Sequence, residues 1–366
     1  MRALSLENGS GNKPDHPEVA SRRILINLLV LSVAVLIFTA VLELTVRIVF
    51  WRSLDFAMEM WKYAIELKRP VADPSLSFVH VPNRSAFLMG VQVSINSRGL
   101  RDREYQELKP PDTYRIVMLG DSTTLGWGVE QDQTIPKILE RELNRSPIAG
   151  YRRCEVLNSG VGNYDTVQEV AHYRTYDRAL HPDLVILDYF INDAEPVPSE
   201  RHPALLGQSY LLAFAISRYD TLLQFAGVRP GWKDYYANLY ADGRPGLLAA
   251  QQALGNLTDL TREEGTTLLV TIIPELHQIN SAYPFTREQQ KIKDLLAVRH
   301  VPVIDLIDGL RGHGPEATLW ATTTDPHPNA KANALIVSQI APWVWENATK
   351  HASDSGHTLP GAGRVR

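Results

Sequence analysis

Three side chains of this sequence are of the types that together make a nucleophilic site. Ser122 follows an apolar run at residues 114–119, within the segment Gly-Asp-Ser-Thr-Thr. A serine attacks a carbonyl carbon only when a base takes its proton. His327 is the candidate base because imidazole titrates near neutral pH, and Asp325, two residues earlier, is suited to hold its tautomer. Both short motifs are common by chance, so their weight depends on whether the fold brings them together.

An ester hydrolase also needs hydrogen-bond donors where negative charge develops on the carbonyl oxygen. The segment 158–166 (Asn-Ser-Gly-Val-Gly-Asn-Tyr-Asp-Thr) follows a second apolar run, and its glycines allow a tight backbone turn. We expect the backbone N–H of Gly162 or Asn163 to be one donor. The segment also fits an ordinary loop with Asp165 or Thr166 as a helix N-cap, and the two interpretations are compatible.

A third polar segment follows the apolar run at 184–187 and contains Asn192. Its side-chain amide is a suitable oxyanion donor, beside the backbone N–H of Ser122. Asp121 and Asp193 flank these two residues. We expect both carboxylates to hydrogen-bond loop amides near the site.

Apolar runs and helical patterns alternate through residues 113–348. The expected strands are 114–119, 154–157, 184–187, 267–273 and 301–305. The expected helices are 134–143, 167–180, 247–263, 286–298 and 329–345. This alternation predicts an α/β fold with a parallel sheet covered on both faces. Such sheets carry their sites at the carboxyl ends of the strands, which is where the polar segments fall.

The polar segments, in this order and after these strands, resemble the SGNH (GDSL-type) hydrolase superfamily. The resemblance covers roughly residues 115–345. It implies a flavodoxin-like, three-layer α/β/α domain and a serine esterase. It also implies that Ser122 is the nucleophile, His327 the base with Asp325 as its partner, and Asn192 an oxyanion donor.

The chain departs from the family pattern at three positions. Asn163 stands where a glycine usually donates to the oxyanion hole, which leaves Gly162 as an alternative donor. Phe190 replaces the usual glycine two residues before Asn192 and is expected to narrow the pocket. The common Asp-x-x-His spacing would put Thr324 in the acid's place, but Asp325 is the nearby carboxylate.

Residues 24–42 are uncharged and long enough to cross a hydrocarbon core of about 30 Å as a helix. A cleaved signal peptide has a shorter apolar core, about 7–15 residues, followed by a small-residue cleavage site that this sequence lacks. We therefore expect a retained transmembrane anchor at 22–52, behind a disordered tail at 1–21.

Arginines flank the anchor on both sides. Arg22 and Arg23 precede it and favour a cytoplasmic N-terminus, although Arg47 and Arg52 weaken the asymmetry. The expected protein is a single-pass inner-membrane protein with an exported (periplasmic or extracytoplasmic) catalytic domain.

Residues 53–112 form the expected helical and β-rich prelude. Its first part is expected to continue the anchor helix to about residue 68, with aromatics such as Phe56 either at the membrane interface or packed under the domain. Residues 96–103 resemble the lead-in of membrane-anchored, exported bacterial members of the superfamily. An insertion or lid is expected at 198–242, with an apolar helix and an aromatic cluster. For the aromatic cluster, core or lid packing is favoured over a sugar platform or a membrane-facing patch. Residues 349–366 are expected to be a disordered tail.

The composition of the 366-residue chain excludes several classes. Its formal net charge of -4 gives no electrostatic case for a nucleic-acid partner. The single cysteine, Cys154, excludes an internal disulfide, and we expect it to be a buried small hydrophobe. No His-Glu-x-x-His motif or Cys/His cluster occurs, so we expect neither a metal nor a cofactor.

The predicted function is hydrolysis of a carboxylic ester through an acyl-enzyme, with an acetylated extracytoplasmic glycan or small acyl ester as first-choice substrate. An O-acetyltransferase would use the same three residues. A lipase or thioesterase is a further alternative, given the anchor and the apolar insertion. The non-enzymatic alternative is a membrane-tethered binding module with an inactive site.

Overall fold

The structure is a computed structural model and describes residues 17–146, 148, 150–198 and 206–354. Expectations for residues 1–16, 199–205 and 355–366 lie outside the described residues.

A five-stranded parallel sheet in the order β6-β5-β7-β8-β9 forms the centre of the domain. Its strands are β5 (Thr113–Leu119), β6 (Arg153–Asn158), β7 (Leu184–Tyr189), β8 (Thr267–Ile272) and β9 (Val303–Asp305). Both β5 and β7 are buried along their whole length, as expected for strands covered on both faces. From β5 the chain continues to β6 on one side of the sheet, and from β7 it continues to β8 and β9 on the other side. The loops after β5 and β7 therefore leave the sheet in opposite directions, and a crevice forms between the carboxyl ends of these two strands.

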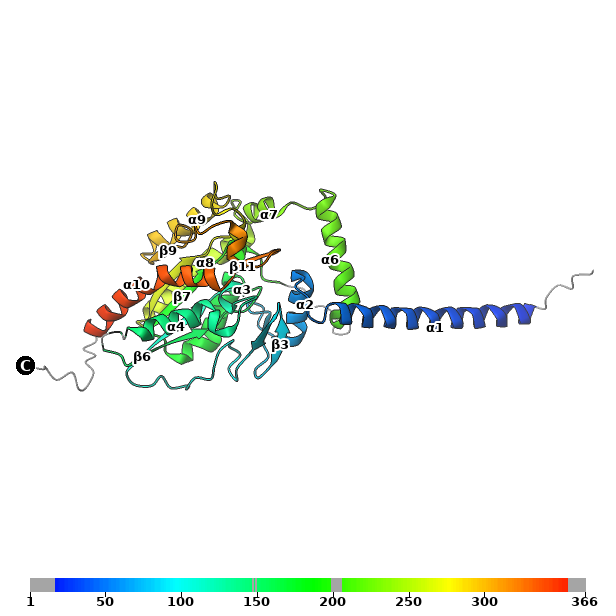
Figure 1. Ribbon diagram of the computed structural model, residues 1–366, viewed down its shortest axis with the longest axis horizontal. Helices are drawn as coiled ribbons and strands as arrows, with labels where there is room; N and C mark the ends of the chain where they lie inside the picture. The colour runs from blue at the N-terminus through cyan, green and yellow to red at the C-terminus, as the bar shows by residue number, and fades with distance from the viewer. Residues whose placement is uncertain (1–16, 147, 149, 199–205, 355–366) are drawn as a thin grey trace, which may run out of the picture.

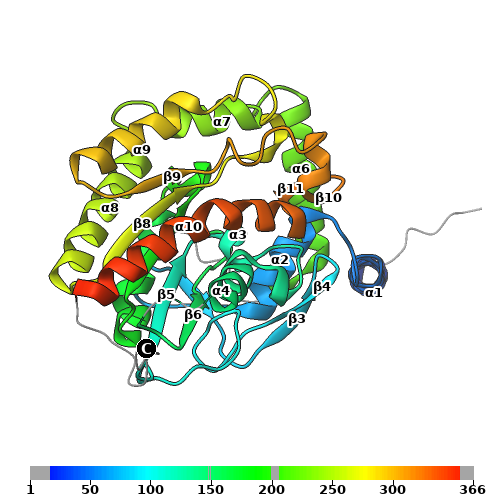
Figure 2. The ribbon, with the colours of Figure 1, turned by 60° about the vertical axis from the view of Figure 1, so that its left-hand side comes forward.

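Helices on the two faces of the sheet complete three layers (Figure 2). On one face α4 (Ile135–Arg145) packs against α10 (Ala330–Asp354), and α5 (Thr166–His172) packs against α8 (Pro245–Glu263) on the other. The chain then passes through α9 (Thr286–Val298) between β8 and β9. This arrangement confirms the predicted α/β/α fold of flavodoxin-like strand order.

Two predicted boundaries need correction. The helix expected over 167–180 changes its hydrogen bonding after α5, to a π turn at Tyr173–Asp177 and a 3-10 turn at Arg178–Leu180. The tail expected to be disordered from 349 is helical to Asp354. Ala348 and Ala352 are buried against the core, so the last turns of α10 have an apolar side to pack.

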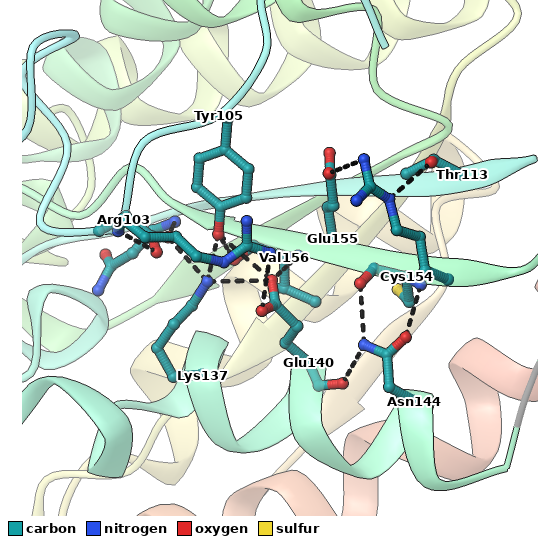
Figure 3. Close-up of polar contacts among 12 residues, drawn as sticks. Arg103, Tyr105, Thr113, Lys137, Glu140, Asn144, Cys154, Glu155 and Val156 are labelled. Carbon is teal, nitrogen blue, oxygen red and sulfur yellow. Dashed lines mark hydrogen bonds and ion pairs between the residues drawn. The ribbon is translucent and has the colours of Figure 1, made fainter. Parts of the chain in front are cut away.

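Strand β6 lies at an edge of the sheet, and side chains of α4 cover its free backbone groups (Figure 3). The Asn144 amide donates to the Cys154 carbonyl and accepts its N–H, both at 2.9 Å, while Glu140 accepts the Val156 N–H at 2.8 Å. These bonds prevent the edge from pairing with another strand. Cys154 is buried, as predicted, and burial raises the pKa of its thiol well above the usual value.

Helix α1 (Pro17–Val49) projects away from the domain (Figure 1). Within the described residues it is the one helix long and apolar enough to cross a membrane, since an 18-residue window inside Ser21–Val49 has a mean hydropathy of 2.8. It begins at Pro17, so the tail predicted over 1–21 is helical at its end. The prediction of one helix to about residue 68 is wrong, because the chain turns at 50–55 and α2 (Phe56–Leu67) starts again with Asp55 as its N-cap.

Smaller elements connect these parts. The strands β1 (Lys68–Pro70) and β2 (Phe78–His80), β3 (Ser85–Leu88) and β4 (Val91–Ser94), and β10 (Trp320–Thr322) and β11 (Asp325–Pro328) form three antiparallel pairs. The insertion contains α6 (Tyr210–Phe225) and α7 (Trp232–Leu239).

Candidate active site

Ser122 begins α3 (Ser122–Leu125), a single turn that follows β5 at the carboxyl edge of the sheet. The Asp121 side chain caps this turn and accepts the Thr123 N–H at 2.7 Å. At Gly120 a Cβ atom would lie 2.0 Å from the Thr124 hydroxyl oxygen, so a glycine is needed for the strand to enter the turn this tightly.

His327 and Asp325 both lie on β11 and meet Ser122 across the crevice. The Ser122 Oγ is 2.8 Å from His327 Nε2, and His327 Nδ1 is 2.6 Å from Asp325 Oδ1. An ionised carboxylate can only accept, so the imidazole proton belongs on Nδ1 and Nε2 is free to accept from the serine hydroxyl. Thr324, the alternative position for the acid, is exposed.

The surroundings of His327 make it a stronger base. Burial by itself would lower the pKa of His327, but the hydrogen bond and the negative charge of Asp325 outweigh it, so the pKa lies above its ordinary value. Burial would raise the pKa of Asp325, but its hydrogen bond and charge pairing with His327 bring that pKa below the ordinary value. Asp325 is therefore ionised at neutral pH.

We expect the activity to rise with pH along a single ionisation whose midpoint lies above about 6.5, the ordinary histidine value. Protonated His327 cannot take the serine proton, and a raised pKa keeps it protonated to higher pH. The measurement is kcat/KM for a soluble ester against pH, with spontaneous hydrolysis subtracted. In Asp325→Asn the midpoint should move down, and a midpoint that stays in place would contradict this account.

Asn192 lies on the turn after β7, facing Ser122 across the crevice between β5 and β7. Its Nδ2 donates to Asp121 Oδ2 at 3.0 Å, which leaves the second amide hydrogen for another acceptor. Asp193 accepts the Phe190 N–H at 3.2 Å. The expectation that Asp121 and Asp193 hydrogen-bond groups of the nearby loops is confirmed. Phe190 is half-buried and packs against the core.

The loop after β6 lies directly against α3. A Cβ atom at Gly160 would lie 2.3 Å from the Leu125 backbone nitrogen, so only glycine permits this approach. The Gly162 N–H donates to the Tyr63 hydroxyl at 2.9 Å and is already used. Asn163 is exposed and has φ 64, a left-handed conformation that asparagine tolerates better than most residues other than glycine. Asp165 caps α5, as the ordinary-loop interpretation expected.

A buried chain of hydrogen bonds from the prelude fixes this loop. His80 Nδ1 lies 2.9 Å from the Gly99 carbonyl and therefore carries the proton, so Nε2 accepts the Tyr63 O–H at 2.6 Å. Burial lowers the pKa of His80 to about 3, which keeps the ring neutral. Lys68 donates to the Gly162 carbonyl on the other side. Both backbone groups of Gly162 are thus held by residues outside the sheet domain.

We expect Tyr63→Phe to lower kcat roughly 10-fold, because the unanchored loop would lose its alignment with Ser122. Tyr173→Phe is the matched control. It also removes the hydroxyl of a buried tyrosine, but that hydroxyl donates to Glu264 at 2.9 Å and not to the loop after β6. Each variant should lose about 1–3 kcal/mol of unfolding free energy, measured by urea denaturation. Equal kcat losses in both would mean that Tyr63 acts through stability alone.

Arg101, from the segment 96–103, supports the turn that carries Ser122. Its fully buried guanidinium donates to the carbonyls of Leu125, Gly126 and Val129, the last at 2.7 Å. These carbonyls belong to the end of α3 and the loop that follows it. The prelude therefore fixes the turn that carries Ser122.

Two aromatic side chains lie against the catalytic edge. The Phe56 ring stacks on the His327 ring at 5.6 Å between centroids, and Trp127 lies 6.4 Å from the same ring. Phe56 thus packs against the domain, as one of the two alternatives for the prelude aromatics expected, and because it is also 44% exposed the interface alternative stays a prediction. Trp51 is 71% exposed.

The aromatic cluster of the insertion is mainly packed. Tyr240 is buried and its hydroxyl lies 2.7 Å from that of Tyr189, while Trp232 and Tyr236 pack against the core beside Phe285. Core packing was the favoured interpretation, and it is confirmed for these residues. Helix α7 also contacts the turn that carries Asn192.

Sequence reasoning missed three prelude residues that support the site: Tyr63, His80 and Arg101. Their contacts span 17 to 99 positions, and no local pattern reports contacts at that range. The N-cap Asp55 was a usable signal that a new helix begins there.

Comparison with known proteins agrees with this geometry. Residues 118–335 match the GDSL-like lipase/acylhydrolase family, and they make up more than half of the chain. The chain belongs to this family. It is a carboxylic ester hydrolase of the SGNH type.

The solved structures that the chain matches resemble it only distantly. TesA is 16% identical with a TM-score of 0.41, covering 63% of this chain and 97% of its own. The acetyl xylan esterase AlAXEase is 12% identical with a TM-score of 0.39, covering 63% and 99%. The lipase/acylhydrolase from Enterococcus faecalis is 15% identical with a TM-score of 0.40, covering 64% and 96%. No curated protein sequence matches the chain.

Proposed function

We propose that Ser122 attacks the carbonyl carbon of an ester, with His327 as general base and Asp325 as the group that orients it. The observation that carries this assignment is the continuous hydrogen-bond chain from Ser122 Oγ through the imidazole to Asp325. Such a chain activates a hydroxyl that is otherwise a poor nucleophile.

The reaction has two halves. In the first half, Ser122 Oγ forms a bond to the carbonyl carbon of the ester while His327 Nε2 takes the serine proton. His327 then gives that proton to the alcohol as its C–O bond breaks, and an acyl-serine remains. Water then attacks the acyl group, its proton passes to His327, and the acid leaves as Ser122 recovers its hydrogen.

For the oxyanion we assign the backbone N–H of Ser122, the backbone N–H of Asn163 and the side-chain amide of Asn192. Gly162 was the alternative to Asn163, but its N–H donates to Tyr63. The left-handed φ of Asn163 explains why asparagine can stand in the place of the family's usual glycine.

The proposed location is the outer side of a cytoplasmic membrane, with α1 retained as an anchor. A signal sequence near the N-terminus can also form a long apolar helix, but a cleaved segment would not be built into the fold. Glu43 of α1 accepts the backbone N–H groups of Tyr210 and Leu211, at 3.1 and 2.9 Å. The Phe50 and Phe214 rings also pack at 5.5 Å, which supports retention.

The proposed substrate is an acetyl ester on an extracytoplasmic glycan or small molecule. Acetyl, butyryl and octanoyl esters should be compared with and without a sugar acceptor, measuring free acid and acylated sugar separately. We expect the acetyl ester to react fastest and to release acetate whether or not the sugar is present. Faster octanoyl turnover would favour a lipase, and acceptor-dependent acylation of the sugar would favour an O-acetyltransferase.

A further inference from the structure

Helix α6 carries an apolar face that its own domain does not cover. Ile216, Tyr219 and Leu222 are 42%, 61% and 65% exposed, and Ala215 and Ala226 share their side of the helix. The opposite side contacts protein, where Tyr210 hydrogen-bonds Glu66 and Phe214 packs on Phe50. A surface helix normally turns its apolar side to the core. Here that side points away from the core, which indicates an apolar partner.

The N-terminus of α6 is held beside Glu43 of α1 by hydrogen bonds. The uncharged run 24–42 spans about 28 Å as a helix, close to the thickness of a hydrocarbon core. Glu43 is the first charged residue after it and lies at the edge of that core. Its carboxylate caps α6 by accepting from Tyr210, Leu211 and the Ser209 hydroxyl. The first turn of α6 is therefore held at the height of the membrane boundary.

From this point α6 runs across the axis of α1 and not along it (Figure 1). If α1 crosses the bilayer, α6 then lies along the bilayer surface. The α1–α2 turn lies beside it, with Trp51 71% and Leu54 50% exposed, and Arg218 of α6 pairs with Asp55 of the turn. Tryptophan and tyrosine are the residues enriched at this depth.

We infer that the exposed face of α6 lies in the interfacial layer of the bilayer that α1 crosses, and that it holds the catalytic edge toward the membrane. The inference rests on the proposed anchor and not on the proposed chemistry. A short series of contacts links α6 to the site. Arg218 pairs with Asp55, and the next residue, Phe56, stacks on His327.

Helix α6 contacts the apolar boundary of the lipid layer and does not depend on the charge of the lipid headgroups. Arg218 and Arg229 are paired, with Asp55 and Asp220. Attachment of α6 should therefore follow buried apolar area and be insensitive to the anionic lipid content, unlike that of a basic amphipathic helix.

The test uses the full chain in phosphatidylcholine vesicles, in a Cys154→Ala background, with a bimane label at single introduced cysteines. Lipids brominated near the glycerol quench labels that lie at the interface. We expect a label at Leu222→Cys to be quenched at least about twofold, because an interfacial helix lies about 5–10 Å into this boundary. A label at Gln224→Cys, exposed on the opposite side of α6, should keep its emission. Tyr219→Cys repeats the measurement should Leu222→Cys fail to fold.

A label at Leu31→Cys in α1, which lies mid-span and is therefore measured in lipids brominated deep in the acyl chains, separates the possible outcomes. If it is quenched while Leu222→Cys is not, the anchor stands and the inference fails. If it is not quenched, the anchor and the inference fail together, while labelling of Ser122 would remain an independent test of the chemistry. Equal quenching at positions 222 and 224 would also overturn it. A second copy of the chain on this face would shield Leu222→Cys from bromine, with emission that depends on protein density, and would overturn it too.

Discussion

Ser122→Ala should lower kcat by on the order of 10⁴-fold or more, because it removes the only group that forms the acyl-enzyme. The hydroxyl lies 2.8 Å from His327 Nε2 and almost no void is left by its loss, so the fold should persist. The measurement is turnover of a soluble acetyl ester, together with labelling by a serine-reactive fluorophosphonate. Wild-type enzyme should label at one serine and the variant should not.

Ser338→Ala is the control for this substitution. Its side chain is exposed, and its hydroxyl donates to the Leu335 carbonyl within α10 and not to a residue of the site. It should keep full activity and labelling. Equal labelling of Ser122→Ala and wild type would remove the basis for the proposed nucleophile, and a wild type that never labels would favour the inactive binding module.

Asp325→Asn should lower kcat by on the order of 10³-fold with little change in KM. An asparagine keeps the shape of the side chain but removes the charge that raises the pKa of His327, and its amide can hold the imidazole in the wrong tautomer. Steady-state kinetics at a pH above the acid limb separates this loss from a simple shift of the pH profile.

Thr324→Ala provides the matched comparison at the neighbouring position. Thr324 occupies the acid's place by the commoner family spacing, yet its side chain is exposed while Asp325 is 1% exposed and bonded to His327. The variant should retain activity within about twofold, as expected for a surface substitution. If Thr324→Ala lost as much as Asp325→Asn, the assignment of the acid would be wrong.

The sheet could be predicted from the sequence because each strand is a continuous apolar run. Residues 114–119 and 184–187 have no other stable place than a sheet covered on both faces, and the strand ends then define the site. The residues Ser122, Asn192, Asp325 and His327 follow from their positions after these strands.

The support of the site could not be predicted, because it depends on contacts distant in sequence. The Tyr63 hydroxyl meets Gly162 across 99 positions, and Arg101 is buried only because the end of α3 supplies carbonyls for it. The π turn after α5 has a similar cause, since Asp177 reaches back to Ser159 and His172. The spacing of apolar residues over 167–180 is the same whether or not these hydrogen bonds form, so it could not predict the π turn.

The contacts of Glu43 with α6 and of Phe56 with His327 have a consequence for release from the membrane. A protease that cut between α1 and α2 would free a domain whose α6 had lost its cap. A cut after α2 would also remove Phe56, whose ring packs on His327, and the Tyr63 hydroxyl that anchors Gly162. If α1 is the retained anchor we propose, shedding of the domain would therefore silence the enzyme rather than disperse it, and its action would be confined to the membrane surface.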